Sequence, residues 1–192
     1  ARERDAAGYR QTVEACQRAA QRMRRLIESL LELARFDAGQ EVLKRMQFDF
    51  SKTILDGVEM VQPLAGERHV KIISELAPLA ITGDSERLSQ IVVNLLTNAI
   101  QYNRPDGEVR VKLAAEAGLA VLTIADTGQG IAPENLPRVF ERVYRADLSR
   151  TGAGNAGLGL SICRAIIAAH GGTIEVSSEE NVGTTFTMRL PA

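Results

Sequence analysis

The fold is decided by residues 84–103, DSERLSQIVVNLLTNAIQYN, which read as one long helix. Asp84 stands where an N-cap carboxylate accepts the free N–H groups of the first turn, and Pro105 follows just after the end. Apolar residues recur at helical spacing on two faces, so we expect the helix to be buried on two sides. These residues are Leu88, Ile91, Val92, Leu95 and Ala99 on one face and Val93, Leu96 and Ile100 on the other.

A single line of amides interrupts the apolar faces of this helix. The amides follow one another at three or four residues and therefore share one side. Burying an amide without a partner costs about 1–3 kcal/mol. One interpretation is a polar network with a neighbouring strand, and the other is a site where amide oxygens hold a hard cation and its phosphate ligand. The line consists of Gln90, Asn94, Asn98 and Gln101.

The composition limits partners and compartment. With 192 residues the chain can bury a core, and one domain with a helical extension is expected. A formal net charge of −1 leaves no basic surface, which argues against nucleic acid as a partner. Cys16 and Cys163 form no CxxC pair, so we expect small core residues rather than a disulfide or metal ligands. No apolar run reaches the roughly 20 residues of a bilayer span, so we expect a cytoplasmic segment without membrane contact of its own, any anchor lying outside these residues.

Residues 1–40 have a different character from the rest. Apolar residues alternate steps of four and three, and charged residues crowd the other faces, as in a helix that packs along one seam. Such a helix needs partner helices, from a second copy or from sequence outside these residues. Gly39 is placed to end it. The seam consists of Tyr9, Val13, Cys16, Ala20, Met23, Ile27, Leu30 and Ala34, widened by Leu26, Leu31 and Leu33.

Residues 41–192 mix helices and strands in an α+β pattern. The order predicts a two-layer α/β sandwich, with a mixed sheet covered by helices on one face. Besides the helix at 84–103, we expect a strand within 41–50, a helix capped by Ser51 and running to about Glu67, strands at 70–74 and 79–82, a hairpin of 108–115 and 119–125, a helix over 157–170, and strands at 173–178 and 184–190.

A glycine-containing stretch, Asp126 to Gly130, comes directly off the apolar strand that ends at Ala125. A carboxylate at the mouth of a strand can accept a hydrogen bond from a ligand amine. Gly128 and Gly130 lack Cβ atoms and so allow close approach. A solvated turn is the alternative interpretation.

A second glycine-rich stretch is residues 150–160, RTGAGNAGLGL. Its N–H groups could fold around phosphate, and Gly157 to Gly159 open a helix whose dipole favours an anion. The stretch matches GxGxxG, but no strand precedes it, so we reject a dinucleotide fingerprint. A disordered surface loop is the alternative. Just before it, FERVYR at 140–145 carries two guanidinium groups that could contact phosphate, or could simply form a solvated charged helix.

In this order the stretches resemble one family: the catalytic region of two-component sensor histidine kinases, within the GHKL ATP-binding superfamily. The heptad helix ending LLELARFDAGQ resembles the second helix of the family's dimerisation and phosphotransfer hairpin. The resemblance implies a Bergerat-type ATP-binding domain over 41–192 and a hairpin helix over 1–40 that lacks the H box. The matching motifs are NLLTNAIQY (N box), DTGQGI (first glycine box), FERVYRAD (F box), GNAGLGLSI (second glycine box) and GTTFTMRLP (closing strand pair).

The resemblance implies ATP and Mg²⁺ as ligands and a role for each matching position. Asn94 and Asn98 would hold Mg²⁺, Tyr102 would pack on adenine, and Asp126 would read its amino group. Catalytic roles would fall to Asn94, Arg142 and Arg145, the two arginines reaching the γ-phosphate. Further nucleotide contacts are implied for Gln101, Gly128, Gly130, Ile131, Tyr144, Thr184 and Thr185, and for the lid residues Gly154, Gly157, Leu158, Gly159 and Leu160.

Departures from the family pattern concern activity more than binding. Gln101 stands where the family usually has a basic residue, Val143 replaces a Phe, and Asn155 replaces a lid Gly. No H-box histidine is present. His69 precedes a strand and His170 ends a helix, so we expect structural or solvated roles for both.

The resemblance implies transfer of the γ-phosphate to a histidine-bearing helix outside this chain, and onward relay to the receiver domain of a response regulator. A homodimer with a sensor domain and a membrane anchor is expected for the intact protein. The alternatives are a nucleotide-binding regulatory module without kinase activity and a GHKL-type ATPase. Such ATPases typically have Glu at the Asn94 position to activate water, and an amide cannot act as a general base. Asn94 therefore favours phosphoryl transfer.

Overall fold

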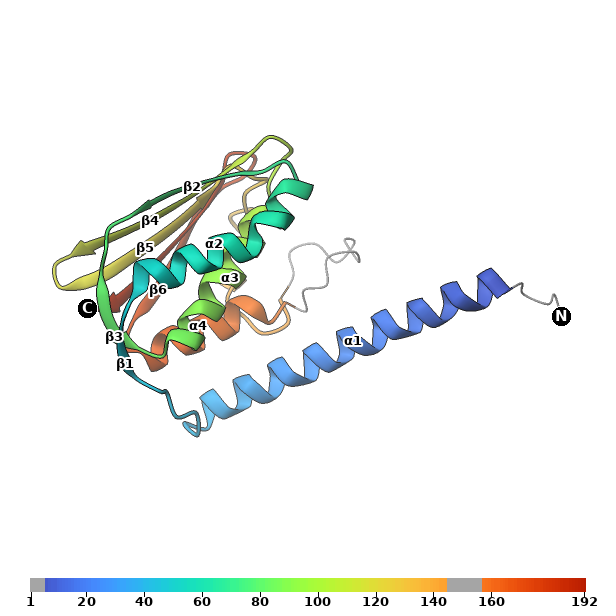
Figure 1. Ribbon diagram of the computed structural model, residues 1–192, viewed down its shortest axis with the longest axis horizontal. Helices are drawn as coiled ribbons and strands as arrows, with labels where there is room; N and C mark the ends of the chain where they lie inside the picture. The colour runs from blue at the N-terminus through green and yellow to red at the C-terminus, as the bar shows by residue number, and fades with distance from the viewer. Residues whose placement is uncertain (1–5, 145–156) are drawn as a thin grey trace.

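The computed structural model describes residues 6–144 and 157–192. A twisted sheet forms one layer, three helices cover one of its faces, and the long N-terminal helix runs along the outside of the helical layer and projects beyond it (Figure 1). In chain order the elements are α1 (Ala6–Asp37), β1 (Met46–Asp49), α2 (Phe50–Glu67), β2 (Lys71–Leu76), β3 (Ala80–Gly83), α3 (Ser85–Gln101), β4 (Glu108–Glu116), β5 (Leu119–Asp126), the 3-10 helix η1 (Leu136–Arg138), α4 (Gly159–Ala169), β6 (Thr173–Glu179) and β7 (Gly183–Pro191).

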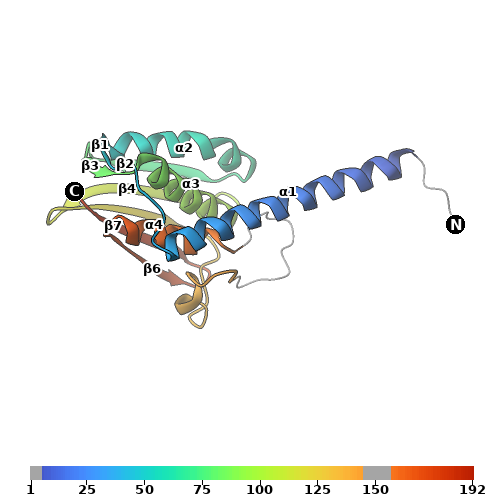
Figure 2. The same ribbon diagram turned by 90° about the horizontal axis from the view of Figure 1, so that it is seen from below.

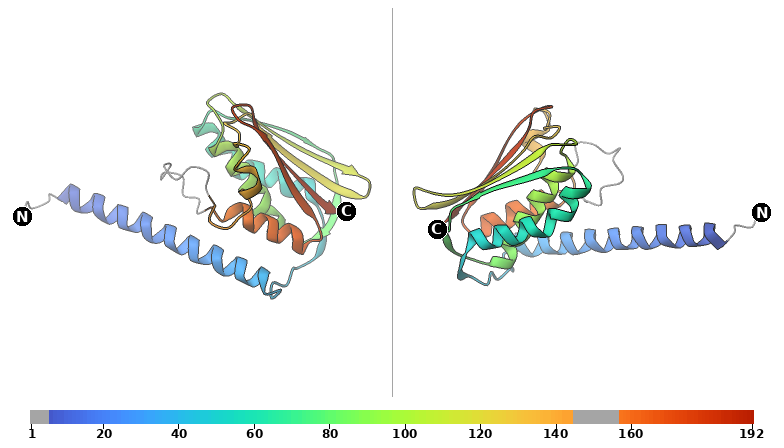
Figure 3. Two further views of the ribbon diagram at one scale, coloured as in Figure 1. Left: turned by 180° about the vertical axis from the view of Figure 1, so that it is seen from behind. Right: turned by 45° about the horizontal axis from the view of Figure 1, so that its top comes forward.

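The main sheet has five strands in the order β2-β4-β5-β7-β6. β2 runs parallel to β4 and the other neighbours are antiparallel, so the sheet is mixed. β1 and β3 form a separate two-stranded antiparallel sheet. Ala117 and Gly118, with φ of 49° and 79°, make the two-residue turn between β4 and β5. The expected two-layer sandwich with helices on one face is confirmed (Figure 3).

Two of the predicted helix ends are confirmed and one predicted cap is wrong. Asp84 caps α3 by accepting from the Arg87 N–H at 3.2 Å, and Gly39 follows α1 with φ of 63°, as expected. The prediction that Ser51 caps α2 was wrong. Asp49 is the cap, because its carboxylate accepts from both the backbone N–H of Ser51 at 3.1 Å and the Ser51 hydroxyl at 2.6 Å.

Helix α3 lies at the centre of the core, between α2, α4 and the sheet. Both predicted apolar faces are buried, apart from Val93, which is half-buried. Gly57 lets α2 approach closely, since a Cβ there would lie 2.8 Å from the Val92 Cγ1 atom. The fully buried side chains of α3 are Leu88, Ile91, Val92, Leu95, Leu96 and Ile100, and all belong to one continuous hydrophobic cluster.

Helix α1 contacts the rest of the molecule through its C-terminal end, where it packs against α4 (Figure 2). Leu33 is buried there, and Leu26 and Phe36 pack partly against the core. Leu26 and Leu33 belong to the predicted widening of the seam, whereas Leu31 and the main seam residues remain exposed. The expectation of a core position was right for Cys163 and wrong for Cys16, which lies on the exposed seam. In the described residues, no helix combines the length and apolar character that a bilayer span requires.

Arg87 on α3 anchors the end of α1. Its guanidinium pairs with Glu32 of α1 at 2.5 Å and with Glu41 of the following segment. The Gln90 amide nitrogen also donates to the two Glu32 oxygens, at 2.9 and 3.1 Å. The guanidinium lies 5.8 Å from the Phe36 ring centroid. The three charged side chains are 14–27% exposed, so solvent screens this cluster less than a surface ion pair.

His170 ties the end of α4 to the start of α3. The buried imidazole accepts the Asp84 N–H through Nε2 at 3.0 Å, and its Nδ1 lies 2.8 Å from the Ile166 carbonyl oxygen. A neutral ring with hydrogen on Nδ1 satisfies both groups. The expected structural role is confirmed for this histidine, whereas His69 lies exposed in a turn.

We expect His170→Phe to lower the free energy of unfolding by about 1–3 kcal/mol, because the ring is kept but the buried Asp84 N–H loses its acceptor. Urea unfolding at neutral pH measures this change. His69→Asn is the matched control: φ is 54° at this exposed residue, a conformation that Asn tolerates, so the change should stay within about 0.5 kcal/mol. Equal stability of the Phe variant and the parent would contradict the role given to His170.

We expect Arg87→Met to release the end of α1, because Glu32 and Glu41 lose their cation. Most helical stability in proteins comes from tertiary packing, so amide hydrogen exchange over residues 26–36 should become at least about tenfold faster once the end of α1 is released. Exchange in β4 and β5 should not change. Arg24→Met is the control, because the Arg24 side chain is 74% exposed on α1 itself. Unaltered protection of residues 26–36 in the Arg87 variant would show that the anchor is not needed.

Candidate functional site

Asp126 ends β5, opposite Thr184 of β7. Its Oδ1 accepts from the backbone N–H groups of Gly128 at 2.8 Å and Thr184 at 3.3 Å. Within the described part of the chain, Oδ2 accepts no hydrogen bond. Burial raises the pKa of this carboxyl above its ordinary value, against the opposing effect of the two N–H donors. The half-buried carboxylate is therefore held at Oδ1 by two donors, while Oδ2 keeps its capacity to accept a hydrogen bond.

The first glycine box is held by neighbouring backbone. The Gln129 N–H donates to the Tyr102 carbonyl at 3.1 Å, so the end of α3 meets the loop after β5. A Cβ on Gly128 would lie 2.3 Å from the Tyr102 oxygen, and one on Gly130 would lie 2.1 Å from the Glu179 oxygen. Both glycines are thus required by the packing of the protein itself, in addition to any ligand.

The strand pair β6–β7 closes the other side of this loop. The Ile131 N–H donates to the Ser178 hydroxyl at 2.8 Å, and that hydroxyl lies 2.9 Å from the Thr184 hydroxyl. Thr184 is buried and Thr185 half-buried. Sequence reasoning missed Ser178, for which no motif gives a signal. It also missed the contact of Gly183, where a Cβ would lie 1.9 Å from the Asp126 carbonyl oxygen.

A second cluster forms where α3 meets α4. The Asn94 Nδ2 donates to the Cys163 sulfur at 3.1 Å. A Cβ on Gly159 would lie 2.5 Å from Asn94 Oδ1, so this glycine lets the first turn of α4 cover the amide. Burial raises the pKa of the Cys163 thiol to about 12, so the thiol is neutral. The sequence marked Asn94 and Gly159 and gave no signal for Cys163 beyond a core position.

The other described residues of the second glycine box differ in burial. Gly157 has φ of 72° and precedes α4. Leu158 is buried in the core and Leu160 packs partly against it, so the side chain of Leu158 serves the core. Gly154 and Arg145 lie outside the described residues.

Two of the amides on α3 form hydrogen bonds with different neighbouring helices. Gln90 binds Glu32 of α1, and Asn94 binds Cys163 of α4. Both partners are on helices, so the interpretation as a network with a neighbouring strand does not hold for these two amides. Asn98 and Gln101 are half-buried further along the same helix, beside Tyr102.

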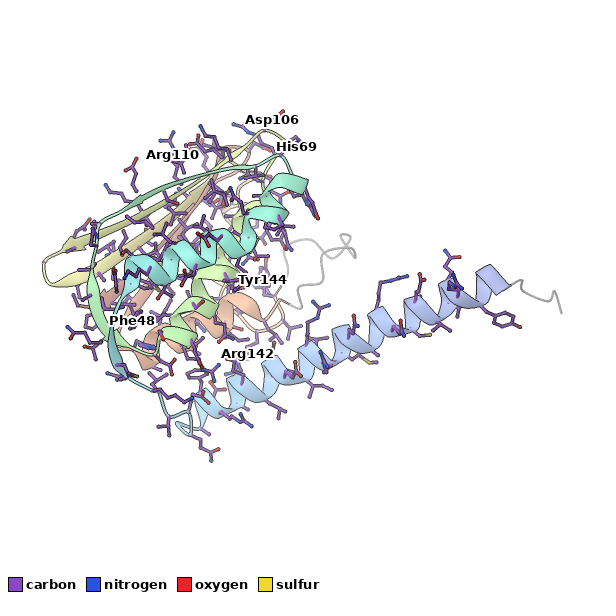
Figure 4. All side chains as sticks on the ribbon, in the orientation of Figure 1. Phe48, His69, Asp106, Arg110, Arg142 and Tyr144 are labelled. Carbon is purple, nitrogen blue, oxygen red and sulfur yellow. The ribbon has the colours of Figure 1, made fainter. Side chains whose placement is uncertain are left out.

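The F-box residues are directed to protein partners in this structure. Arg142 pairs with Asp37 at the end of α1, and Figure 4 places it on the side of the molecule along which α1 runs. The Tyr144 hydroxyl binds the Asn135 amide oxygen, and the Arg138 guanidinium lies 4.4 Å from the Tyr144 ring centroid. In this structure the Arg142 guanidinium is therefore engaged by Asp37 of α1.

The two clusters share helix α3. Tyr102 contacts the Asp126 loop at the C-terminal end, and Asn94 lies eight residues earlier, about 12 Å along the axis. The loop after the Asp126 carboxylate is thus bound to one end of α3, and the Asn94 amide lies further back on the same helix. No group of three His, Cys, Asp or Glu suited to a metal occurs among the described residues. The side-chain amide oxygens of Asn94 and Asn98 are hard donors of the type that Mg²⁺ accepts.

Comparison with known proteins supports this arrangement. Residues 83–192 match the family described as histidine kinase-, DNA gyrase B- and HSP90-like ATPase. Sensor protein SrrB of Staphylococcus aureus is 38% identical over 176 residues, covering 90% of this chain and 30% of SrrB. Full-length ShkA, solved in complex with AMPPNP, gives a TM-score of 0.85 at 30% identity over 98% of this chain and 40% of ShkA. The mycobacterial sensor histidine kinase MprB gives 0.66 at 31% identity over 77% of this chain and 97% of the solved MprB chain.

The matched region contains both clusters described above, from Asn94 to Thr184. The chain spans well under half the length of SrrB and of ShkA. The resemblance seen in the sequence motifs is confirmed by these matches. The chain belongs to the sensor histidine kinases, as an ATP-binding catalytic region of the histidine kinase-, DNA gyrase B- and HSP90-like ATPase family.

Proposed function

We propose that this region binds Mg-ATP and transfers the γ-phosphate to a histidine on a phosphoacceptor helix outside the described chain. In that step an imidazole nitrogen forms a bond to the γ-phosphorus, the bond to the oxygen that leaves with ADP breaks, and the imidazole proton passes to solvent. The internal histidines are poor acceptors. Both ring nitrogens of His170 are engaged within the fold, and His69 lies in the turn before β2.

The observation that carries the proposal is the state of the Asp126 carboxylate. Two backbone N–H groups hold its Oδ1, which fixes the direction of Oδ2. An exocyclic amine is a matching donor, because it has hydrogens to give and fits a single acceptor. Tyr102 lies at the adjoining end of α3, where its ring could pack on a purine. Thr184, Thr185, Ile131, Gly128 and Gly130 complete the proposed adenine end of the site.

The residues at the other end fit a magnesium ion and phosphates. Asn94 and Asn98 would hold the ion through amide oxygens, which are hard donors of the type that Mg²⁺ accepts. Gly159 leaves room for the Asn94 amide itself, because a Cβ at this position would lie 2.5 Å from Oδ1. When bound, Mg²⁺ neutralises negative charge on the phosphates. Gln101, Tyr144, Arg142, Arg145 and the glycine-box residues from 154 to 160 are the further proposed contacts.

Asn94 also favours transfer over hydrolysis. Activation of a water molecule needs a general base, and a carboxamide has no basic site of suitable pKa. The residues proposed for the site therefore position the nucleotide and stabilise charge, which is the main part of the work in phosphoryl transfer.

The partners follow from the proposed reaction. The first is the histidine-bearing helix, in the same protein or in a dimer partner, and the second is the receiver domain of a response regulator. Helix α1, with its exposed seam, is proposed to belong to the dimerisation hairpin of a homodimer, with residues 41–192 as the catalytic domain. We place the region in the cytoplasm, as part of a membrane-anchored sensor.

We expect Asp126→Asn to weaken binding of a non-hydrolysable ATP analogue by at least about tenfold, because a charged acceptor for the adenine amine is lost. Isothermal titration calorimetry with and without Mg²⁺ measures this. The fold should tolerate the change, because an amide oxygen can still accept the two N–H groups. Asp56→Asn, on the exposed side of α2, is the matched control and should bind as the parent does. Retained affinity in the Asp126 variant would refute the assignment, and absence of binding by the parent would refute the proposed function.

We expect the chain to transfer labelled phosphate from ATP to a longer form of the protein that carries the acceptor hairpin and is itself inactivated by Asp126→Asn. The product should be acid-labile and alkali-stable, as a phosphohistidine is, and the chain alone should accumulate no label. Asn98→Ala in the donor chain should reduce transfer by at least about a hundredfold, since a metal-holding amide is lost. Steady release of inorganic phosphate without labelled protein would favour an ATPase instead. Nucleotide binding without either product would favour a regulatory module.

A further inference from the structure

The contact between Asn94 and Cys163 links the middle of α4 to the proposed cation site. Cys163 is 1% exposed, and its sulfur accepts the Asn94 Nδ2–H at 3.1 Å. Gly159 lies one helical turn earlier on the same face of α4. Its missing side chain leaves room for the amide, since a Cβ would lie 2.5 Å from Oδ1 and 2.6 Å from Nδ2. The carboxamide is thus enclosed by α4 on one side.

The two ends of a carboxamide are chemically different, so its orientation matters for a cation. The terminal torsion of Asn is broad, and rotation by half a turn would exchange oxygen for nitrogen. Only the oxygen can bind Mg²⁺. A sulfur that accepts the N–H therefore selects the orientation in which Oδ1 is the end left for a ligand. Gln90, one turn earlier, is fixed in a comparable way by Glu32.

We propose that Cys163 is a positioning residue that sets the Asn94 amide with its oxygen toward the metal and phosphates. The inference rests on the proposed function of Asn94 as a magnesium ligand. It assigns to the thiol a task distinct from filling the core, because a residue of the same size without an acceptor would leave the Asn94 N–H without its partner. The sulfur itself does not touch the nucleotide.

The test compares Cys163→Val, which keeps an apolar side chain and removes the acceptor, with Cys163→Ser, which keeps an acceptor. Calorimetry with a non-hydrolysable ATP analogue gives the affinity in Mg²⁺ and in EDTA, and the ratio isolates the contribution of the metal. We expect the Val variant to show a ratio of affinity in Mg²⁺ to affinity in EDTA that is about tenfold lower than in the parent, while its affinity in EDTA stays within about twofold. The Ser variant should keep most of the parent's ratio. In NMR spectra of the ligand-free protein, the side-chain amide signals of Asn94 should move in the Val variant and those of Asn103 should not.

Other outcomes overturn the inference. An equal loss of affinity with and without Mg²⁺ would mean that Cys163 only supports the fold. If the Val variant and the parent had the same ratio of affinity in Mg²⁺ to affinity in EDTA, Cys163 would not be needed to orient the Asn94 amide. If Val fails to fold, Cys163→Ala removes the sulfur without adding bulk and gives the same comparison. A parent protein that binds nucleotide equally well in Mg²⁺ and EDTA would end the inference and leave the nucleotide site standing. A parent that binds no nucleotide at all would end both.

Discussion

Helix α3 has to meet two demands that conflict. It buries apolar side chains against α2, α4 and the sheet, and it also carries a line of amides whose polar groups need partners. The structure resolves the conflict by giving the amides partners on neighbouring helices, Glu32 of α1 for Gln90 and Cys163 of α4 for Asn94. The same helix then ends at the loop after β5, where the Tyr102 carbonyl accepts from Gln129. The positions of the Asn94 cluster and the Asp126 loop both depend on this one element.

The contacts at the start of α3 explain how the surrounding elements are kept in register with it. Asp84 accepts from the backbone of Arg87 and, at 2.9 Å, from that of Lys44, while its own N–H is bound by His170. The segment after α1, the N-terminus of α3 and the C-terminus of α4 therefore meet at one residue. These donors outweigh the effect of burial and lower the pKa of the Asp84 carboxyl. Arg87 extends the junction to α1, because its guanidinium pairs with Glu32 of that helix.

Local patterns in the sequence were sufficient for most of the fold. The spacing of apolar residues in 84–103 predicted a helix buried on two sides, and the alternation of strands and helices predicted the mixed sheet. Asp49 was missed as a cap because Ser and Asp both suit this position, and only the geometry shows that Ser51 donates to Asp49. The exposure of Cys16 was missed because the spacing of apolar residues in α1 does not show whether another helix covers them.

The candidate site was predictable where motifs mark it and not where distant segments meet. Asn94, Asp126 and Thr184 stand within recognisable motifs, and the structure puts Asp126 and Thr184 side by side. The bonds of Asn94 to Cys163 and of Arg87 to Glu32 join residues 69 and 55 positions apart and leave no periodic trace in the chain. Arg142 illustrates the same limit, because nothing near it in sequence indicates that Asp37 would take its guanidinium.

Because α1 is attached through one end, the rest of the helix can move as a rigid arm about that attachment. Residues 6–25 form about 30 Å of helix beyond the docked part that begins at Leu26, and Figure 1 shows this portion standing clear of the rest. A tilt of only about 10° at the attachment moves the free tip by roughly 5 Å, by the geometry of a rigid arm of that length. The same geometry applies to a movement that starts at the free end. A displacement of several ångströms at the tip would produce a much smaller displacement near Glu32 and Arg87, and a small change in distance is enough to form or break an ion pair or a hydrogen bond.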